Sequence, residues 1–318
     1  MNKKIPIIID CDPGQDDAIN LFLAMSSPDE LEIIGITTVA GNVSVSLTSR
    51  NARIICEIAD RPDIPVFAGS SHPMKRKLVT AEHVHGKTGL NGIDIYEPIH
   101  PLHEMHAVDF IVETLLAAED ESITLVLTGP LTNIALAIQK NPLILGKIAE
   151  IIMMGGAMRE GGNHSPSAEF NIVVDPHAAG IVFHSNLKIS VLGLDVTYQV
   201  PATQARKDRI RGITNDVARS TSKMLDLFDR YAAAKYSSSG APLNDPCTIA
   251  FLLKPELFTG KPCNLTVETE SELTMGHTAI DFWQVTDRSA NVNWVYSVDS
   301  NGFYDLLIER LSRFDDRL

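Results

Sequence analysis

The stretch that most constrains the fold is residues 5 to 17, IPIIIDCDPGQDD, close to the amino terminus. A run of β-branched apolar residues ends at Asp10, a Pro-Gly pair predicts a turn, and an amphipathic segment with helical spacing begins at Asp16. This order predicts a strand, a tight loop and a helix, with Asp10 and Asp12 at the carboxyl end of a buried strand. Open α/β sheets bind their ligands at that edge. We therefore expect a site at this loop.

Four carboxylates lie within this short segment, at positions 10, 12, 16 and 17. Like charges packed together raise one another's pKa and repel unless a positive charge lies among them. Ca²⁺ or Mg²⁺ supplies such a charge, because both ions take oxygen ligands. One alternative is that Asp16 or Asp17 merely caps the helix, which explains only part of the cluster.

A second alternative is the DxD pair of a haloacid-dehalogenase-like phosphatase, in which the first aspartate after a strand is a nucleophile. Such proteins usually carry Thr or Val two residues beyond the second aspartate, where this chain has Gly14. The later lysine and acidic motif of a phosphatase have no evident match here.

Strands and helices alternate along the first two thirds of the chain, and every glycine-rich turn follows a strand. The further strands that we predict are residues 31–42, 64–69, 123–127, 150–158 and 188–196. The helices between them are predicted at 46–60 and 105–118, near Thr132 and after Pro176, with a long aperiodic loop at 70–101. This alternation predicts an α/β fold with an open, mainly parallel, Rossmann-like sheet that helices cover on both faces.

The last third of the chain has a different pattern. It predicts a helical and small β addition, with helices at 202–235 and 247–258, strands at 265–270, 277–283 and 292–299, and a closing helix at 302–311. We find no internal repeat, and we expect residues 1–318 to form a single domain.

Composition excludes several classes of protein. A net charge of −13 and a pI near 5.2 argue against a nucleic-acid partner, because phosphate binding needs a basic face. No apolar run is long enough to span a membrane, and the first residues do not resemble a signal peptide, so we expect a cytoplasmic protein with no membrane partner. The four cysteines are scattered without CxxC spacing, which indicates neither a zinc site nor a disulfide framework.

Seven motifs occur in order along the chain: DCDPGQDDA, TTVAGN, VHGKTGL, TGPLTNIA, MGGA, PSAEFNIVVDP and GAPLNDPCT. Together they resemble the nucleoside hydrolase family, the inosine-uridine preferring ribohydrolases, from residue 5 to beyond residue 255. The resemblance implies hydrolysis of the N-glycosidic bond of a small-molecule ribonucleoside. It also implies one Ca²⁺ ion, with ligands at Asp12, Asp17, the backbone carbonyl of Thr128, and Asp245. Without the resemblance, Asp245 before Pro246 reads as a helix cap.

The resemblance implies further roles, residue by residue. Asp12 matches the general base that activates the water held by the metal. Asp16 and Asn42 match residues that grip the ribose hydroxyls. His85 matches a histidine beside the base. The groups at the 3′- and 5′-hydroxyl side match Asn163, Glu169 and Asn171. The apolar lining of the sugar matches Met154 and Phe170, and the helix that closes over the base matches Tyr231 and Tyr236. Each also has an ordinary structural explanation, as a solvated loop residue or as part of the core.

The chain departs from the family at Asn244, where many members carry a histidine that protonates the leaving base. An amide can hydrogen-bond a base but donates no proton at neutral pH. The surrounding GAPLNDPCTIAFLLKPELF most resembles the pyrimidine-preferring branch, so we predict a preference for uridine and cytidine, with Asn244 beside the base. The alternative is a ribonucleoside-binding protein that has lost leaving-group protonation. The resemblance also implies a homodimer or homotetramer.

Overall fold

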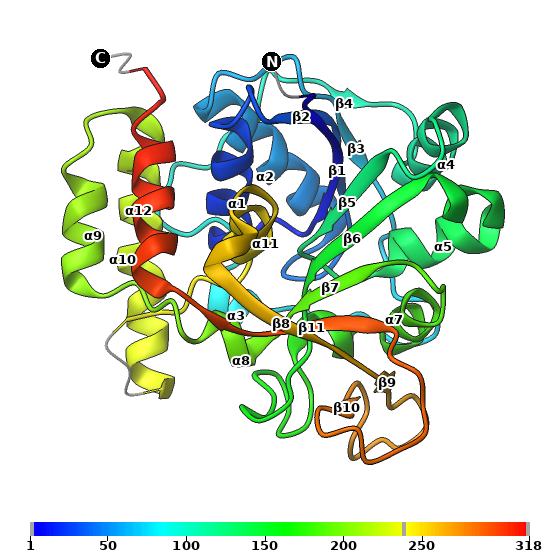
Figure 1. Cartoon of the computed structure of the whole chain (residues 1–318). Helices are drawn as coiled ribbons and strands as arrows, with labels where there is room; N and C mark the ends of the chain where they lie inside the picture. Colours follow the sequence, from blue (N-terminus) through cyan, green and yellow to red (C-terminus); the bar gives the residue numbers. More distant parts are fainter. Residues whose placement is uncertain (1–2, 237–239, 316–318) are drawn as a thin grey trace.

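The computed structural model describes residues 3–236 and 240–315, with the side chains of residues 229–236 left out. Its centre is a nine-stranded sheet in the order β4-β3-β2-β1-β5-β6-β7-β11-β8 (Figure 1). Every neighbouring pair is parallel except β11 with β8. The strands are β1 (Ile5–Cys11), β2 (Leu31–Thr38), β3 (Val66–Ala68), β4 (Leu102–His103), β5 (Ile123–Leu127), β6 (Ile148–Met154), β7 (Ile189–Leu192), β8 (Phe258–Cys263) and β11 (Val292–Val298).

The strand order reverses between β1 and β5. From β1 the chain moves outward through β2, β3 and β4, then returns to pair β5 with the other side of β1 and continues through β6 and β7. At such a switch point the loops after the two central strands turn away from each other and leave a crevice at their carboxyl ends. The loops that begin at Asp12 and Thr128 therefore border one crevice.

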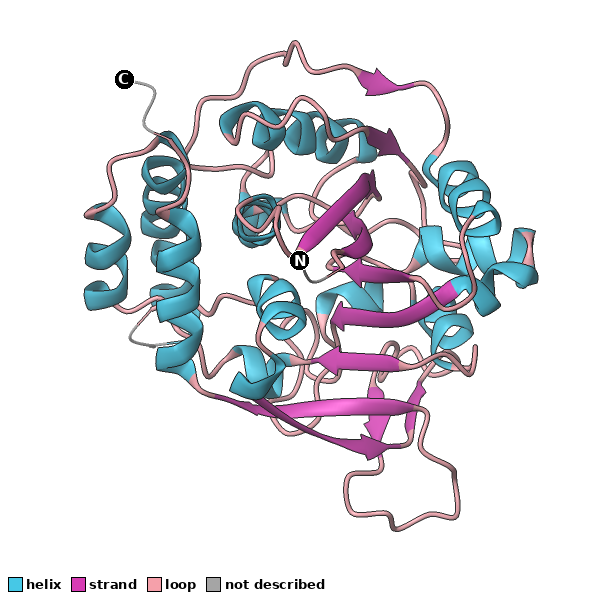
Figure 2. Cartoon of the chain, turned by 45° about the horizontal axis from the view of Figure 1, so that its top comes forward, coloured by secondary structure: helices cyan, strands magenta, loops and turns pink. Residues whose placement is uncertain are grey.

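Helices cover both faces of the sheet (Figure 2). The longer helices are α1 (Gln15–Met25), α2 (Val45–Ile58), α4 (Ala107–Ala117), α5 (Thr132–Lys140), α7 (Pro176–Phe183), α9 (Gln204–Arg211), α10 (Asp216–Tyr236), α11 (Pro246–Leu253) and α12 (Ser300–Leu311). The shorter ones are α3 (Glu82–His85), α6 (Phe170–Val174) and α8 (Leu194–Thr197), with 3-10 turns at Pro142–Lys147 and Pro255–Leu257.

The alternation of side chains along β1 explains the two layers of helices. Ile7 and Ile9 point into a core shared with α1, α2, α10, α11 and α12, whereas Ile8 points into a second core shared with α4, α5 and α7. Successive side chains of a strand face opposite sides of its sheet, so an uninterrupted apolar run is what a strand buried on both faces requires. The predicted α/β fold is confirmed.

Several predicted boundaries are wrong in the carboxyl third. Residues 247–258 are not one helix: α11 ends at Leu253, just before the Lys254-Pro255 pair, and β8 begins at Phe258. A residue that precedes proline is disfavoured in helical conformation. β8 was missed because its sequence, FTGKPC, alternates poorly. Pro262 is tolerated in β8 because β8 is an edge strand. No strand lies on its outer side that would need the N–H group that proline lacks.

Other differences are smaller. The strand predicted at 188–196 ends at Leu192 and is followed by the short helix α8, and the region 202–235 divides into α9 and α10. The loop 70–101 contains only α3. Two of the predicted late strands, β9 (Leu265–Val267) and β10 (Thr278–Ile280), form a separate antiparallel pair, while the third, β11, joins the main sheet. Among the described residues, no helix is long and apolar enough to cross a membrane.

Candidate active site

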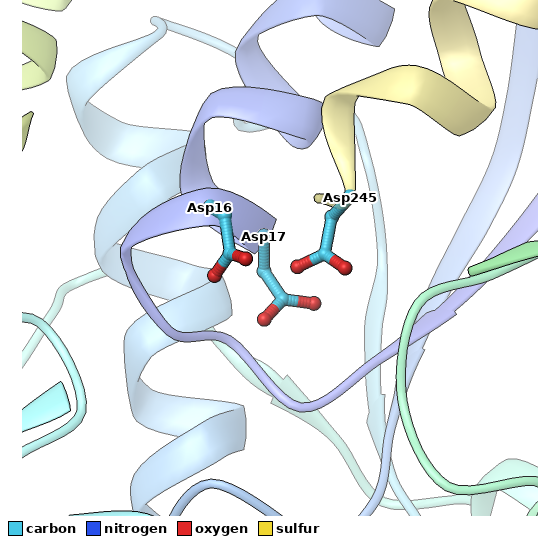
Figure 3. A group of neighbouring side chains, drawn as sticks. All are labelled: Asp16, Asp17 and Asp245. Atoms are coloured by element: carbon cyan, nitrogen blue, oxygen red, sulfur yellow. The ribbon is translucent and has the colours of Figure 1, made fainter. Parts of the chain in front are cut away.

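Three carboxylates meet in the crevice. Asp16 and Asp17 lie in the first turn of α1, and Asp245 lies at the start of α11, which packs against α1. Figure 3 shows the three side chains turned toward one another. Each offers an oxygen atom, and these oxygens all lie within 4.8 Å of one another. Asp245 occupies the cap position of α11 but makes no capping hydrogen bond with its side chain, so its carboxylate is directed at the cluster instead.

Asp12 follows β1 and is completely buried. Its Oδ2 accepts the backbone N–H of Asn42 at 2.7 Å, whereas its Oδ1 has no hydrogen-bond partner in the described structure. Glycines crowd both oxygens: a Cβ atom at Gly41 would lie 2.1 Å from Oδ2, and one at Gly129 would lie 2.9 Å from Oδ1. A buried carboxylate oxygen without a partner is rare and calls for a proton, a cation or a bound ligand.

The cluster is electrostatically unfavourable as it stands. Burial, followed by the charge of Asp17, raises the pKa of Asp12 well above its ordinary value. Burial, followed by the charges of Asp16 and Asp17, does the same to the pKa of Asp245. For Asp17, burial and the charge of Asp16 raise the pKa to about 7. At neutral pH these groups must share protons or hold a cation.

The donor atoms fit a hard cation. Asp17 Oδ2 accepts the N–H of Gly14 at 2.9 Å and its Oδ1 accepts the Thr128 hydroxyl at 2.8 Å, so its position is fixed from two sides. The Thr128 carbonyl accepts from Asn171 Nδ2 at 2.9 Å and keeps a second lone pair. Carboxylate and carbonyl oxygens are what Ca²⁺ and Mg²⁺ prefer. Asp12 stands outside the group of mutually close oxygens, and Asp16, which we predicted as a ribose ligand, lies inside it.

A pocket opens above the carboxylates. Its lining includes eleven of the residues that the sequence predicted for the site: Asp16, Asn42, His85, Thr128, Met154, Asn163, Glu169, Phe170, Asn171, Asn244 and Asp245. These residues come from eight separate segments of the chain. Asp12 and Asp17 have no exposed surface and lie beneath the lining. The side chains of Tyr231 and Tyr236 lie outside the described residues.

Comparison with known proteins gives the family. The family model described as inosine-uridine preferring nucleoside hydrolase matches residues 7–305. The chain is a member of this nucleoside hydrolase family. It is 46% identical over 314 residues to an enzyme of Enterobacter sp. named pyrimidine-specific ribonucleoside hydrolase RihA, covering 98% of this chain and 99% of that one.

Solved structures agree with this assignment. The fold is similar to that of a plant nucleoside hydrolase, PpNRh1, with a TM-score of 0.92 at 31% identity over 98% of this chain and 99% of that one. A purine-preferring ribonucleoside hydrolase from Gardnerella vaginalis gives a TM-score of 0.89 at 31% identity over 96% and 98%. The chain is therefore an enzyme of the nucleoside hydrolase class, and the phosphatase alternative is wrong.

In this hydrolase Asn244 is held at both ends of its amide. Its Oδ1 accepts the hydroxyl of Thr197 at 2.8 Å, and its Nδ2 donates to Asp16 Oδ2 at 3.2 Å. Asn244 therefore joins α8 to the acidic cluster. The sequence predicted a group beside the leaving base, but it gave no indication of this link to Thr197, which lies 47 residues earlier.

Other polar residues of the pocket also have structural partners. Glu169 caps α6 by accepting the N–H groups of Asn171 and Ile172, and it accepts the N–H of Gly156 as well. Burial raises the pKa of Glu169 to about 7. Asn163 Oδ1 accepts the N–H of Phe170 at 2.9 Å. These contacts hold the loop 155–170 in place above β6, so the polar groups are fixed before any ligand arrives.

The sequence did not predict seven residues of the pocket lining: Ala81, His83, Val84, His164, Tyr198, Phe228 and Pro242. His83 and His164 each lie within a few residues of a predicted site residue, so the neighbourhood of VHGKTGL and PSAEFN was a usable signal. Phe228 had none, because its position on the amphipathic α10 looks like ordinary core packing.

Proposed function

We propose that this enzyme hydrolyses the N-glycosidic bond of pyrimidine ribonucleosides in a Ca²⁺-dependent reaction. The observation that carries the proposal is the group of buried carboxylates beneath a pocket at the switch point of the sheet. The similarity to an enzyme named pyrimidine-specific supports the choice of base. Expected products are ribose and free uracil or cytosine.

The residues that would hold the cation are Asp12, Asp17, the Thr128 carbonyl and Asp245, with Asp16 beside them. The mutual proximity of the Asp16, Asp17 and Asp245 carboxylates supports this set, and Asp12 belongs to it by the family resemblance. When bound, the cation would neutralise the clustered charges and polarise the attacking water. Ca²⁺ rather than Mg²⁺ follows from the family resemblance, and the mixture of several carboxylates with a backbone carbonyl is consistent with it.

Asp12 is the proposed general base. Its Oδ2 is oriented by the N–H of Asn42, and its Oδ1 is available to take a proton from water as that water attacks the anomeric carbon. As the bond to the base breaks, positive charge develops on the ribose ring, by analogy with other glycoside cleavage. The fixed carboxylates and amide oxygens of the pocket stabilise that charge because they are already oriented.

The pyrimidine preference is tested by steady-state kinetics on uridine, cytidine and inosine, with ribose release measured by a reducing-sugar assay. We expect kcat/KM for uridine to exceed that for inosine by about tenfold or more, which is the discrimination that a few contacts in a pocket supply. An inosine value clearly above the uridine value would reject the pyrimidine proposal. Binding of nucleosides without any release of ribose would instead favour the ribonucleoside-binding alternative.

The link from Thr197 through Asn244 to Asp16 gives a second prediction. Asn244→Ala removes both hydrogen bonds, so Asp16 loses its neighbour in the pocket. We expect kcat/KM for uridine to fall about tenfold, which corresponds to the loss of one or two hydrogen bonds. Thr197→Val, which keeps the shape of the side chain but frees Asn244 Oδ1, should give a smaller loss in the same direction. Unchanged kinetics in both folded variants would contradict the positioning of Asp16 by this link.

Three further expectations from the sequence stay predictions. They are the cytoplasmic location, the assembly into a homodimer or homotetramer, and the single domain over residues 1–318. Size-exclusion chromatography with light scattering measures the second directly.

A further inference from the structure

A buried pair of side chains lies behind the pocket. His85, at the end of α3, lines the pocket, and Gln15, the first residue of α1, lies behind it. The Nδ1 atom of His85 is 2.5 Å from the Oε1 atom of Gln15. Both side chains are buried, with 7% of His85 and 1% of Gln15 exposed. Gln15 does not line the pocket itself, and its side chain contacts the lining at His85.

The partner at Nδ1 determines the proton on the ring. The amide of Gln15 turns its oxygen to His85, and its Nε2 has no partner among the described residues. An amide oxygen only accepts hydrogen bonds, so in this orientation the His85 nitrogen that faces it carries the hydrogen. In a neutral imidazole the other nitrogen, Nε2, is then an acceptor. Burial, as the largest cause, lowers the pKa of His85, which favours the neutral ring, although the charge of Asp16 acts in the opposite direction.

The ring is also fixed in orientation. Phe228 stacks on it with ring centroids 5.8 Å apart and planes 23° from parallel. On the Nδ1 side a Cβ atom at Gly14 would lie 2.5 Å from Nδ1, so this edge of the ring packs directly against the Pro-Gly turn. Among the hydrogen bonds of the described residues, none involves Nε2 of His85. The geometry leaves Nε2 as the ring nitrogen available to a ligand.

We propose that Gln15 is a positioning residue that holds His85 in the Nδ1–H tautomer, so that Nε2 accepts a hydrogen bond from an N–H group of the base. The proposal rests on the proposed function for its substrate. Uridine has a single N–H on its base, at N3, so N3–H is the donor that His85 would recognise. The pair would thereby select bases that present an N–H donor at this place, as uracil does at N3 and cytosine does at its 4-amino group, over bases that present only acceptors.

The tautomer is measured directly by long-range ¹H–¹⁵N NMR of the histidine rings in the full-length enzyme, with His85 assigned by comparison with His85→Asn. We expect the wild-type spectrum to show protonated Nδ1 and unprotonated Nε2 for His85 at neutral pH. A proton on Nε2 instead would overturn the proposal, because Gln15 would then present its N–H to the ring. This measurement does not depend on turnover.

The consequence for specificity is tested with Gln15→Met, which matches the length of glutamine but accepts no comparable hydrogen bond. In the wild type, kcat/KM for uridine should exceed that for 3-methyluridine, which lacks the N3–H. In Gln15→Met the uridine value should fall about tenfold, as expected for one lost hydrogen bond, while the 3-methyluridine value changes little. A structural defect would lower both values equally, and the melting temperature measures such a defect separately.

An unchanged tautomer and an unchanged ratio of the two kcat/KM values in folded Gln15→Met would overturn the positioning role. If the wild type released ribose from no nucleoside, the proposed function would fail, while the NMR spectrum would still decide the tautomer of His85. The two failures are therefore distinguishable.

Discussion

Asp12→Asn should lower kcat for uridine by about 10²- to 10⁴-fold, the range measured when a general base is removed. The amide has nearly the shape of the carboxylate and can still accept the N–H of Asn42, so the loop after β1 keeps its conformation. What disappears is the oxygen that takes the proton, because an amide oxygen is a far weaker base. The measurement is steady-state ribose release, accompanied by a thermal unfolding curve to verify the fold.

Asp10→Asn is the matched control for that experiment. Asp10 lies two residues earlier and is also buried, but its Oδ2 accepts hydrogen bonds from the Thr37 hydroxyl and Asn133 Nδ2, whereas Asp12 Oδ1 has no partner among the described residues. Burial raises the pKa of Asp10 to about 7, so a neutral side chain is tolerated there. We expect its kcat to stay within about tenfold of the wild type. Equal losses in the two variants would show that Asp12 acts through structure rather than as the base.

Asp245→Asn should raise the unfolding free energy of the ion-free protein and reduce the additional stabilisation that Ca²⁺ provides. Without a cation, Asp245 is buried against Asp16 and Asp17, and removing its charge relieves repulsion and desolvation, by about 1–3 kcal/mol of unfolding free energy. The wild type should instead gain about 2.7 kcal/mol from Ca²⁺ at a hundred times its dissociation constant. Thermal unfolding with chelator and with Ca²⁺ measures both effects, and turnover should be lost in the variant.

The pH dependence of the stability of the ion-free wild type follows from the same buried charges. The folded chain binds the Asp245 proton more tightly than the unfolded chain does, because burial and neighbouring charges raise its pKa above the ordinary value of 3.8. The unfolding free energy of the wild type therefore falls as pH rises above that value. The difference in unfolding free energy between Asp245→Asn and the wild type should grow as pH rises.

Asp195→Asn provides the control for stability. The Asp195 carboxylate is also buried, but it accepts the backbone N–H groups of Met158 and Arg159 and is not a member of the cluster. Replacing it should lower the unfolding free energy, because one N–H loses its acceptor, and should leave the response to Ca²⁺ intact. A melting temperature that Ca²⁺ raises equally in the wild type and in Asp245→Asn would contradict the proposed ion site.

The sequence was informative about the fold where the signal is local. The apolar run that becomes β1 is buried on both faces, and the alternation of strands with helices led to the parallel sheet. It was misleading where tertiary contacts decide. β8 pairs with β11, a strand 29 residues later in the chain (from Cys263 to Val292), and nothing in FTGKPC indicates that pairing.

The site divides in the same way. Strand-end loops meet at one edge of a parallel sheet, so the convergence of Asp16, Asn42 and Thr128 followed from their positions after strands or at the start of a helix. Asp245 was placed in the site only by the family resemblance. The hydrogen-bond partners of the side chains could not be predicted from those positions. The link from Asn244 to Thr197, the pairing of Gln15 with His85 and the stacking of Phe228 on that ring join segments far apart in the chain.

The two glycines that flank Asp12 restrict how this enzyme can vary in evolution. Even a methyl group at position 41 or 129 would displace the carboxylate oxygens, so neutral drift is blocked at both positions although neither residue carries a functional group. Selection for catalysis therefore also constrains these two glycines, which take no part in the chemistry. Mutational scanning of the two loops would register them as intolerant sites for a purely steric reason.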